Sequence, residues 1–236
     1  MTISELPIIG TSHIEHEGTH YALMDTAATG EKKLVIAGDK SGFAGREHIA
    51  SSSTICPLSA QNATQLRSRL PWLKPIALGT RISAGFGDRL GCATVGHLMA
   101  TKNTGVAPIL AQQSVRENTR TGRTPQQVVD DAMWGAFEFG WREGWGADAD
   151  HLKTLDDIPP FVDAGYTFYT IDPGDFVDDN ATTYDVATLR QKAAKLDWSL
   201  LDSSPDDVVK RLAATKIDGL PLQLDEETLL RATVKY

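Results

Sequence analysis

The sequence contains little cysteine and no long uncharged run of apolar residues. Cys56 and Cys92 are its only cysteines among 236 residues, too few for the disulfide framework of a small secreted domain. No apolar stretch reaches the length of about 18 residues that a membrane span needs, and no basic segment followed by an apolar one resembles a leader peptide. These absences predict a soluble protein of a reducing compartment, the cytoplasm, with no membrane partner.

Positive charge is also scarce. The chain has 23 lysine and arginine residues against 31 aspartate and glutamate residues, which gives a formal net charge of −8. Proteins that hold a phosphate backbone usually carry an excess of positive charge, so nucleic acid is not an expected partner. The 41% of hydrophobic residues is close to the average of soluble globular proteins and predicts a folded chain.

Several common catalytic motifs are missing. The sequence has no Gly-x-Ser-x-Gly segment, no Walker loop, no pair of zinc-binding cysteines, and no cysteine beside a histidine. Gly85, Gly87 and Gly91 imitate a dinucleotide-binding loop, but that loop requires its third glycine at position 90, which is Leu90. The sequence therefore predicts neither a nucleophilic triad nor a nucleotide-binding loop.

The first part of the chain has the pattern of short strands. Apolar and β-branched residues gather in pieces such as residues 20–24 and 33–37, which polar turns separate. Apolar residues then recur at spacings of three and four over residues 62–73, which predicts a helix that ends before Pro75. We therefore expect a small β-rich segment over residues 1–75.

The pattern changes after Pro75 to a repeat of strand, polar tip and helix. The expected strands cover residues 82–86, 107–111, 145–149 and 166–171. This alternation is typical of βα units around a parallel sheet. The strands of such a sheet end at one edge, so the polar tips Asp88, Gln113, Asp150 and Asp172 are expected to cluster there.

The helix after the second of these strands has the clearest boundaries. Thr124 is the expected N-cap, Pro125 the first helical residue, Gln127 the partner in a capping box, and Gly144 the stop. We expect further helices over residues 155–164, 186–196, 205–214 and 225–236.

The chain is too short for a complete barrel of such units. Eight units that begin at residue 82 would run well beyond Tyr236. The expected fold class is therefore α/β, with TIM-barrel-like βα units forming an incomplete barrel over residues 76–236. A smaller open α/β sheet is the alternative, since it also places polar residues at its strand ends. An unpaired edge would favour association into a homo-oligomer.

The densest polar group is the segment around Asp150 and His151. In a strand, Asp148 and Asp150 share one face, and His151 faces the other way unless the strand has already ended. An aspartate beside a histidine supplies a proton-transfer group next to a ligand for a divalent cation. Helix capping and filling of a polar gap are the alternative roles. The other five histidines are expected on the surface or hydrogen-bonded in the core.

Arginine and amide side chains suggest a site for a polyhydroxylated anion. Arg89 follows Asp88 at a strand end, where a guanidinium matches a carboxylate or phosphate. Residues 112–123 form an expected loop whose amides and guanidinium groups suit hydroxyls and a carboxylate; the residues singled out there are Gln112, Gln113 and Arg116. Asp172 is an expected acceptor for substrate hydroxyls. Salt bridges within a solvated surface are the alternative.

Five segments together resemble the tagaturonate epimerase family. They are residues 85–91, 111–117, 121–125, 146–153 and 170–175. The resemblance runs from about Cys56 to the C-terminal residues and is looser before that. It implies a barrel-type, divalent-metal-dependent epimerase that interconverts tagaturonate and fructuronate in hexuronate breakdown. Members of this family are longer, so the chain resembles an N-terminal portion.

The resemblance also implies roles for individual residues. By analogy with the Asp-His pair of metal-dependent aldolases, His151 would bind the metal and Asp150 would move the proton. The residue types add further roles: Lys153 and Asp88 are the other predicted catalytic residues, and Lys153 also helps to hold the anionic substrate. The residues predicted to bind the sugar acid are Arg89, Gln112, Gln113, Arg116 and Asp172.

The implied reaction explains why a metal would be needed. The two hexuronates differ at a carbon β to the ketone, whose hydrogen the carbonyl does not acidify. Inversion there requires a bond to break, as in a metal-assisted retro-aldol cleavage followed by re-addition. There are two alternative functions. One is a class II aldolase acting on sugar acids or sugar phosphates, and the other is a non-catalytic module that binds sugar acids.

Overall fold

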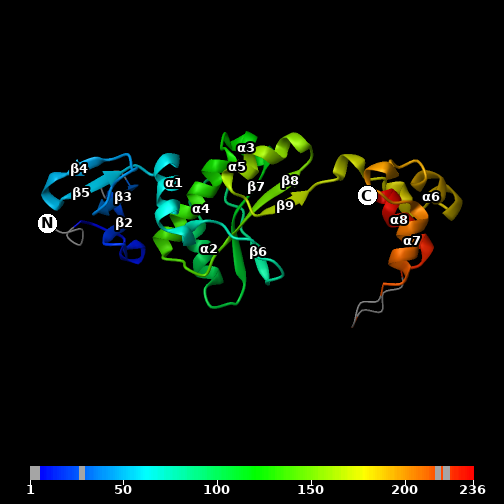
Figure 1. Ribbon diagram of the computed structural model, residues 1–236, viewed down its shortest axis with the longest axis horizontal. Helices are drawn as coiled ribbons and strands as arrows, with labels where there is room; N and C mark the ends of the chain where they lie inside the picture. Colours follow the sequence, from blue (N-terminus) through cyan, green and yellow to red (C-terminus); the bar gives the residue numbers. More distant parts are fainter. Residues whose placement is uncertain (1–5, 27–29, 216–218, 220–223) are drawn as a thin grey trace. The chain divides into compact units, whose positions relative to one another are not determined.

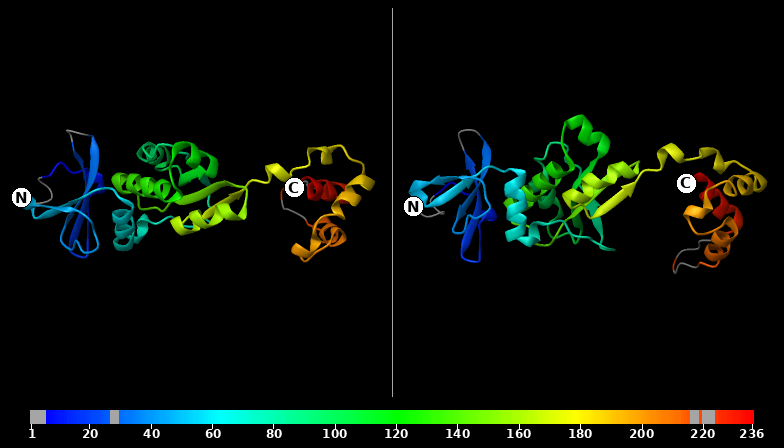
Figure 2. Two further views of the ribbon diagram at one scale, coloured as in Figure 1. Left: turned by 90° about the horizontal axis from the view of Figure 1, so that it is seen from above. Right: turned by 45° about the horizontal axis from the view of Figure 1, so that its top comes forward.

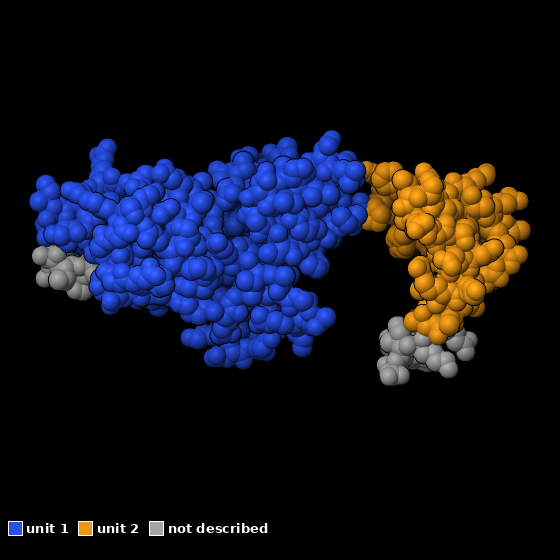
Figure 3. All heavy atoms as spheres, viewed as in Figure 1, with its two compact units in different colours: residues 1–172 blue, residues 173–236 orange. Residues whose placement is uncertain are grey.

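The computed structural model describes residues 6–26, 30–215, 219 and 224–236. It divides into two compact units, residues 1–172 and residues 173–236 (Figure 3). The expected change from a β-rich segment to βα units between residues 75 and 76 lies inside the first unit. As a domain boundary it stays a prediction.

An antiparallel sheet forms the N-terminal part of the first unit (Figure 1). Its strand order is β1-β2-β3-β5-β4, with β1 at Ile14–His16, β2 at Thr19–Thr26, β3 at Glu31–Ala37, β4 at Arg46–His48 and β5 at Ser53–Cys56. The strands expected over residues 20–24 and 33–37 are therefore confirmed. Helix α1, Ala60–Arg69, follows and ends earlier than expected. The reason is Pro71, which starts a separate 3₁₀ turn because a proline has no amide proton to donate to the helix.

A parallel sheet forms the rest of this unit, and its strands lie in sequence order. They are β6 at Ser83–Gly85, β7 at Ala107–Ser114, β8 at Gly146–Leu152 and β9 at Phe168–Ile171. The intervening helices are α2 at Thr94–Thr101, α3 at Val115–Thr121, α4 at Pro125–Phe139 and α5 at Ile158–Ala164, and Figure 2 shows them from two further directions. The mixed α/β class with a part-barrel parallel sheet is confirmed. Closure into a TIM barrel remains a proposal.

One hydrophobic core joins the helices to a single face of the parallel sheet. It contains Leu98 of α2, Phe137 of α4 and Phe161 of α5, together with Ala147 and Ala149 of β8. Alternate residues of a strand face opposite sides, so the side chains between these alanines face away from the helices. The second face of the sheet is therefore available for polar side chains.

The capping predicted for α4 is confirmed, whereas its predicted stop is wrong. Thr124 accepts a hydrogen bond from the backbone of Gln127 and completes a capping box. The helix ends at Phe139 and its C-cap is Gly140, which has φ 75°, and not Gly144. A Cβ atom at residue 140 would lie 2.6 Å from the backbone oxygen of Thr11. Both the left-handed backbone and this close approach require glycine at the C-terminal end of the helix.

The second unit is helical. Its helices are α6 at Val186–Ala193, α7 at Pro205–Ala213 and α8 at Glu226–Lys235. They agree with the helices expected over residues 186–196, 205–214 and 225–236. The unit has a small core of its own, made by Ala181, Leu189, Ala193 and Leu230. No helix in the described part of the chain has the length and apolar character to cross a membrane.

The two cysteines are expected to react differently with alkylating reagents. Cys56 is fully buried, and burial raises the pKa of its thiol to about 11. The thiolate is the nucleophile, so raising this pKa lowers the reactive fraction at neutral pH. Cys92 is exposed. Iodoacetamide should therefore modify Cys92 in the native protein and Cys56 only after unfolding, and peptide mass spectrometry would locate the adduct. Rapid native labelling of Cys56 would contradict this burial.

Candidate functional site at the carboxyl edge of the parallel sheet

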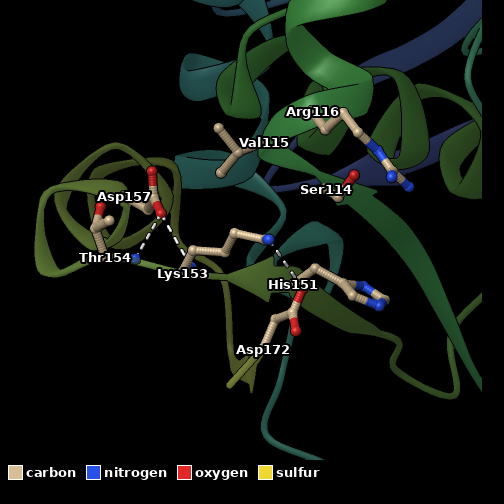
Figure 4. A pocket seen from close by; sticks show the side chains of 8 residues that line it. All are labelled: Ser114, Val115, Arg116, His151, Lys153, Thr154, Asp157 and Asp172. Carbon is tan, nitrogen blue, oxygen red and sulfur yellow. Dashed lines mark hydrogen bonds and ion pairs between the residues drawn. The ribbon is translucent and has the colours of Figure 1, made fainter. Parts of the chain in front are cut away.

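A cleft of about 390 Å³ lies where β7 and β8 end (Figure 4). Its lining comes from the ends of both strands, the residue after β9, the start of α3 and the turn before α5. The residues are Ser114, Val115, Arg116, His151, Lys153, Thr154, Asp157 and Asp172. Four residues predicted from the sequence, Arg116, His151, Lys153 and Asp172, therefore meet in one cleft, at the edge where parallel sheets commonly bind ligands.

His151 and Asp150 form a close pair. Nδ1 of His151 lies 2.7 Å from Oδ1 of Asp150. The alternation of a regular strand would separate them, but β8 is irregular between Ala149 and Leu152, and His151 has φ 54°. This left-handed conformation is uncommon for a residue with a side chain and is often found at functional sites. It places the imidazole beside the carboxylate of the preceding residue.

The pairing leaves the other imidazole nitrogen available. His151 is exposed, with 58% of its side-chain surface accessible, whereas the side chain of Asp150 is 19% accessible. In metal sites, histidine commonly donates one ring N–H to a carboxylate and binds the ion through the other nitrogen. Nε2 of His151 is therefore the donor that this pair offers to a ligand.

Two cationic side chains also line the cleft. Nζ of Lys153 lies 3.8 Å from Oδ2 of Asp172, and Arg116 extends from the first turn of α3 (Figure 4). Asp157 accepts hydrogen bonds from the backbone N–H groups of Lys153 and Thr154, at 3.0 and 2.9 Å. These bonds fix the backbone of the turn that carries Lys153 at the cleft.

The structure adds a polar network that the sequence interpretation did not include. Oδ2 of Asp148 accepts a hydrogen bond from Nε2 of Gln112 at 3.2 Å, and its Oδ1 accepts one from the Thr170 hydroxyl at 2.9 Å. The network links β7, β8 and β9 on the sheet face opposite the helices. Burial raises the pKa of Asp148, which is 3% exposed. The sequence alone could not reveal this network, because it depends on the register of the two strands, in which β7 pairs Gln112 directly with Asp148.

The loop predicted over residues 112–123 is wrong. Strand β7 continues to Ser114, and helix α3 begins at the next residue with a capping box between Ser114 and Glu117. Gln113 is consequently a strand residue on the helix side of the sheet. Its side chain is fully buried, accepts a hydrogen bond from Arg123 at 2.8 Å and donates one to Thr121 at 3.1 Å. It does not line the cleft.

Asp88 and Arg89 already have partners within the protein. The carboxylate of Asp88 accepts hydrogen bonds from the backbone N–H groups of Leu90, Gly91 and Ala93. Burial alone would raise the pKa of Asp88, but these hydrogen bonds outweigh burial and lower it. Arg89 forms an ion pair with Glu117. The four expected polar tips do lie at the carboxyl edge of the parallel sheet. Asp88 and Gln113 nevertheless do not line the cleft, because Asp88 caps its own turn and Gln113 faces the helices.

The donors present account for only part of a metal site. In the described residues, no three His, Cys, Asp or Glu side chains stand together as a group that could hold a metal ion. His151 offers one nitrogen, oriented by Asp150. This arrangement fits one position in the coordination shell of a divalent cation.

Comparison with known proteins places the chain in a family. The model of the tagaturonate epimerase family matches residues 11–236. The chain belongs to this family. The resemblance carried by the five sequence segments is therefore confirmed.

Individual relatives agree with this assignment. Over 151 residues, the chain is 48% identical to a tagaturonate/fructuronate epimerase of Thermotoga maritima, a match that covers 62% of the chain and 31% of the relative. A glycerol-complexed crystal structure of the fructuronate-tagaturonate epimerase of Cohnella laeviribosi is 31% identical, with a TM-score of 0.82 over 99% of the chain and 47% of its own length. The native crystal structure of that enzyme gives a TM-score of 0.81, also at 31% identity, over 97% of the chain and 46% of its length. The chain thus spans about half the length of these solved relatives.

Proposed function

We propose that this protein supplies part of the active site of an epimerase that interconverts D-tagaturonate and D-fructuronate with the help of a divalent cation. The observation that carries the proposal is the contact between Asp150 and His151, whose Oδ1 and Nδ1 atoms lie 2.7 Å apart; His151 lines the cleft at the carboxyl edge of the sheet, and Asp150 is its immediate partner. Family membership supports the choice of substrate. We also propose that the four parallel strands are part of a TIM barrel, that the protein is cytoplasmic, and that it self-associates.

The cleft has the groups that a hexuronate requires. Arg116 and Lys153 are cations at its wall, and a guanidinium binds a carboxylate through two parallel hydrogen bonds. Asp172 offers carboxylate oxygens to sugar hydroxyls. Arg89 suits the substrate carboxylate less well than Arg116 does, because its guanidinium already pairs with Glu117.

The reaction inverts a carbon that bears a hydroxyl group. In the retro-aldol route, Asp150 takes the proton of that hydroxyl, the neighbouring carbon–carbon bond breaks, and its electron pair moves toward the ketone as an enediolate. The aldehyde fragment turns, the enediolate attacks its other face, and Asp150 returns the proton. No net oxidation or reduction occurs. A divalent cation beside Nε2 of His151 would stabilise the negative charge on the substrate oxygens.

The assay must include the part of the enzyme that the chain does not match. The protein is joined to the unmatched portion of the Thermotoga maritima relative, supplied with D-tagaturonate and a divalent cation, and NMR follows the appearance of D-fructuronate. We expect conversion that stops on addition of a chelator. A chimaera that melts cooperatively and binds the sugar acid, yet produces no fructuronate, would contradict the proposal.

A non-catalytic module that binds sugar acids is the second candidate. Arg116 and Lys153 line the cleft and can bind a sugar carboxylate without a metal, which favours this function for the chain alone. Calorimetric titration of the chain with D-fructuronate in the presence of a chelator separates the two. Tight binding that is independent of metal, together with an inactive chimaera, would favour the binding module.

Replacement of Arg116 by alanine is expected to weaken substrate binding. A hydrogen bond to a charged group contributes about 1.5–3 kcal/mol, so KM for tagaturonate should rise by about tenfold or more while kcat changes less. Arg120 is the matched control, because it lies one turn later on the same helix and does not line the cleft. Equal KM values for R116A and R120A would remove Arg116 from the substrate site.

A further inference from the structure

Two histidines of the N-terminal antiparallel sheet stand in direct contact. Nε2 of His13 lies 3.2 Å from Nδ1 of His20. Their rings are nearly parallel, with centroids 5.4 Å apart and planes inclined by 22°. Neither residue lines the cleft described above, so the proposed epimerase reaction does not account for the pair.

The hairpin between β1 and β2 brings the two rings together. Its turn consists of Glu17 and Gly18, which have φ 49° and 73°, the left-handed pair of a two-residue type I′ turn. This turn fixes the register in which Glu15 lies opposite His20. His13 precedes Glu15 by two residues in extended backbone, so it lies on the same face of the hairpin as His20. The backbone therefore holds the imidazoles of His13 and His20 close together without a ligand.

We propose that His13 and His20 form a binding site for a divalent transition-metal ion, with Nε2 of His13 and Nδ1 of His20 as its ligands. Two nitrogens each about 2.0–2.1 Å from one ion are about 2.9 Å apart in an octahedral shell and about 3.3 Å apart in a tetrahedral one. The observed separation of 3.2 Å lies between these values. Imidazole nitrogens suit Zn²⁺, Cu²⁺ and Ni²⁺, so the site would select these ions over Mg²⁺ and Ca²⁺.

Water would occupy the remaining coordination positions unless the side chain of Glu15 turns toward the ion. The register places Glu15 directly across the hairpin from His20 and on the same face. In the arrangement described, its carboxylate does not complete a group of three ligands among the residues described. The site therefore has two fixed nitrogen ligands and an open side, which is suited to an exchangeable ion.

A simple hydrogen bond between the two imidazoles is the competing explanation for the short distance. In that arrangement one ring nitrogen donates and the other accepts. The two explanations differ in their response to added metal, because a hydrogen-bonded pair without metal affinity would bind no ion beyond the background.

The test is a calorimetric titration of the full chain with Ni²⁺, carried out in a His151→Ala background so that the proposed cleft ligand does not contribute. His13→Gln and His20→Gln are compared with His16→Gln, a matched control on the same hairpin whose side chain faces the opposite side. We expect each of the first two variants to weaken the Ni²⁺ site by at least about tenfold. Even loss of groups that only orient metal ligands costs 10–100-fold in affinity. H16Q should bind Ni²⁺ as its parent does.

A second measurement keeps the proposal testable if a variant folds poorly. In the NMR spectrum of the chain with ¹⁵N-labelled histidine, Zn²⁺ should shift the resonances of two imidazoles together, and H13Q and H20Q should identify them. Unchanged Ni²⁺ affinity in both variants, or Zn²⁺ shifts confined to other histidines, would overturn the proposal. Failure of the epimerase assay would leave this result unaffected, because the two sites share no residue.

Discussion

Replacement of Asp150 by asparagine should slow the conversion of tagaturonate in the chimaera by roughly 10²–10⁴-fold, the usual contribution of a general acid or base. Asparagine keeps a side-chain oxygen that can accept the N–H of His151, at the position where Oδ1 of Asp150 now lies 2.7 Å from Nδ1. The orientation of the imidazole should survive, whereas the group that takes the proton is lost. Metal content, measured by atomic absorption, should therefore stay close to that of the unmodified chimaera.

The replacement of His151 by alanine should have a different signature. It removes the nitrogen donor itself, so bound metal should fall together with the rate. Asp163→Asn serves as the control, because this carboxylate lies on α5 and does not line the cleft. If D150N and H151A both retained full metal and near-normal epimerisation, the pair would have a structural role, as a cap and a polar gap filler.

The contact between Asp150 and His151 could not be predicted from the alternation of side chains along a strand. Alternation predicts that Asp150 and His151 point to opposite faces of β8. The irregular register after Ala149 and the left-handed φ of His151 reverse that expectation. A bulge of this kind depends on how β8 pairs with β9, and no pattern within the segment encodes it.

Local signals predicted the helices better than the strand ends. Thr124 and Gln127 make the capping box that their spacing indicates, because both partners lie within one helical turn. The end of β7 was misplaced because Gln112 and Gln113 are polar. Gln112 remains in the strand through its pairing with Asp148, and Gln113 through its contacts with Arg123 and Thr121. Asp148 is distant in sequence, whereas Thr121 and Arg123 lie at and just after the end of a helix that was expected to be a loop.

The fold could be predicted as far as the order of its elements. The βα alternation after residue 75 indicated a parallel sheet, and the four strands do lie in sequence order. The sequence did not indicate which face of the sheet carries polar side chains and which packs against the helices. It arises from register, which places Asp148, Gln112 and Thr170 on the face opposite the helices and the alanines of β8 on the helix side.

Replacement of Phe137 by alanine should lower the free energy of unfolding of the first unit by about 3–5 kcal/mol, the typical cost of removing a phenylalanine side chain from a core. Phe137 is fully buried, and its ring centroid lies 6.3 Å from that of Trp72. It belongs to the cluster that also includes Leu23 and Leu34 of the antiparallel sheet and Ala149 of the parallel sheet. The cavity would therefore open inside this core, beside Trp72.

Urea unfolding monitored by far-ultraviolet circular dichroism measures this cost. Phe139→Ala is the matched control, because it removes the same side chain two residues later on α4, where the ring is only partly buried. F139A should be destabilised by clearly less than F137A, since less apolar surface is lost from the interior. Equal free energies of unfolding for the two variants would contradict the deeper burial of Phe137 in this core.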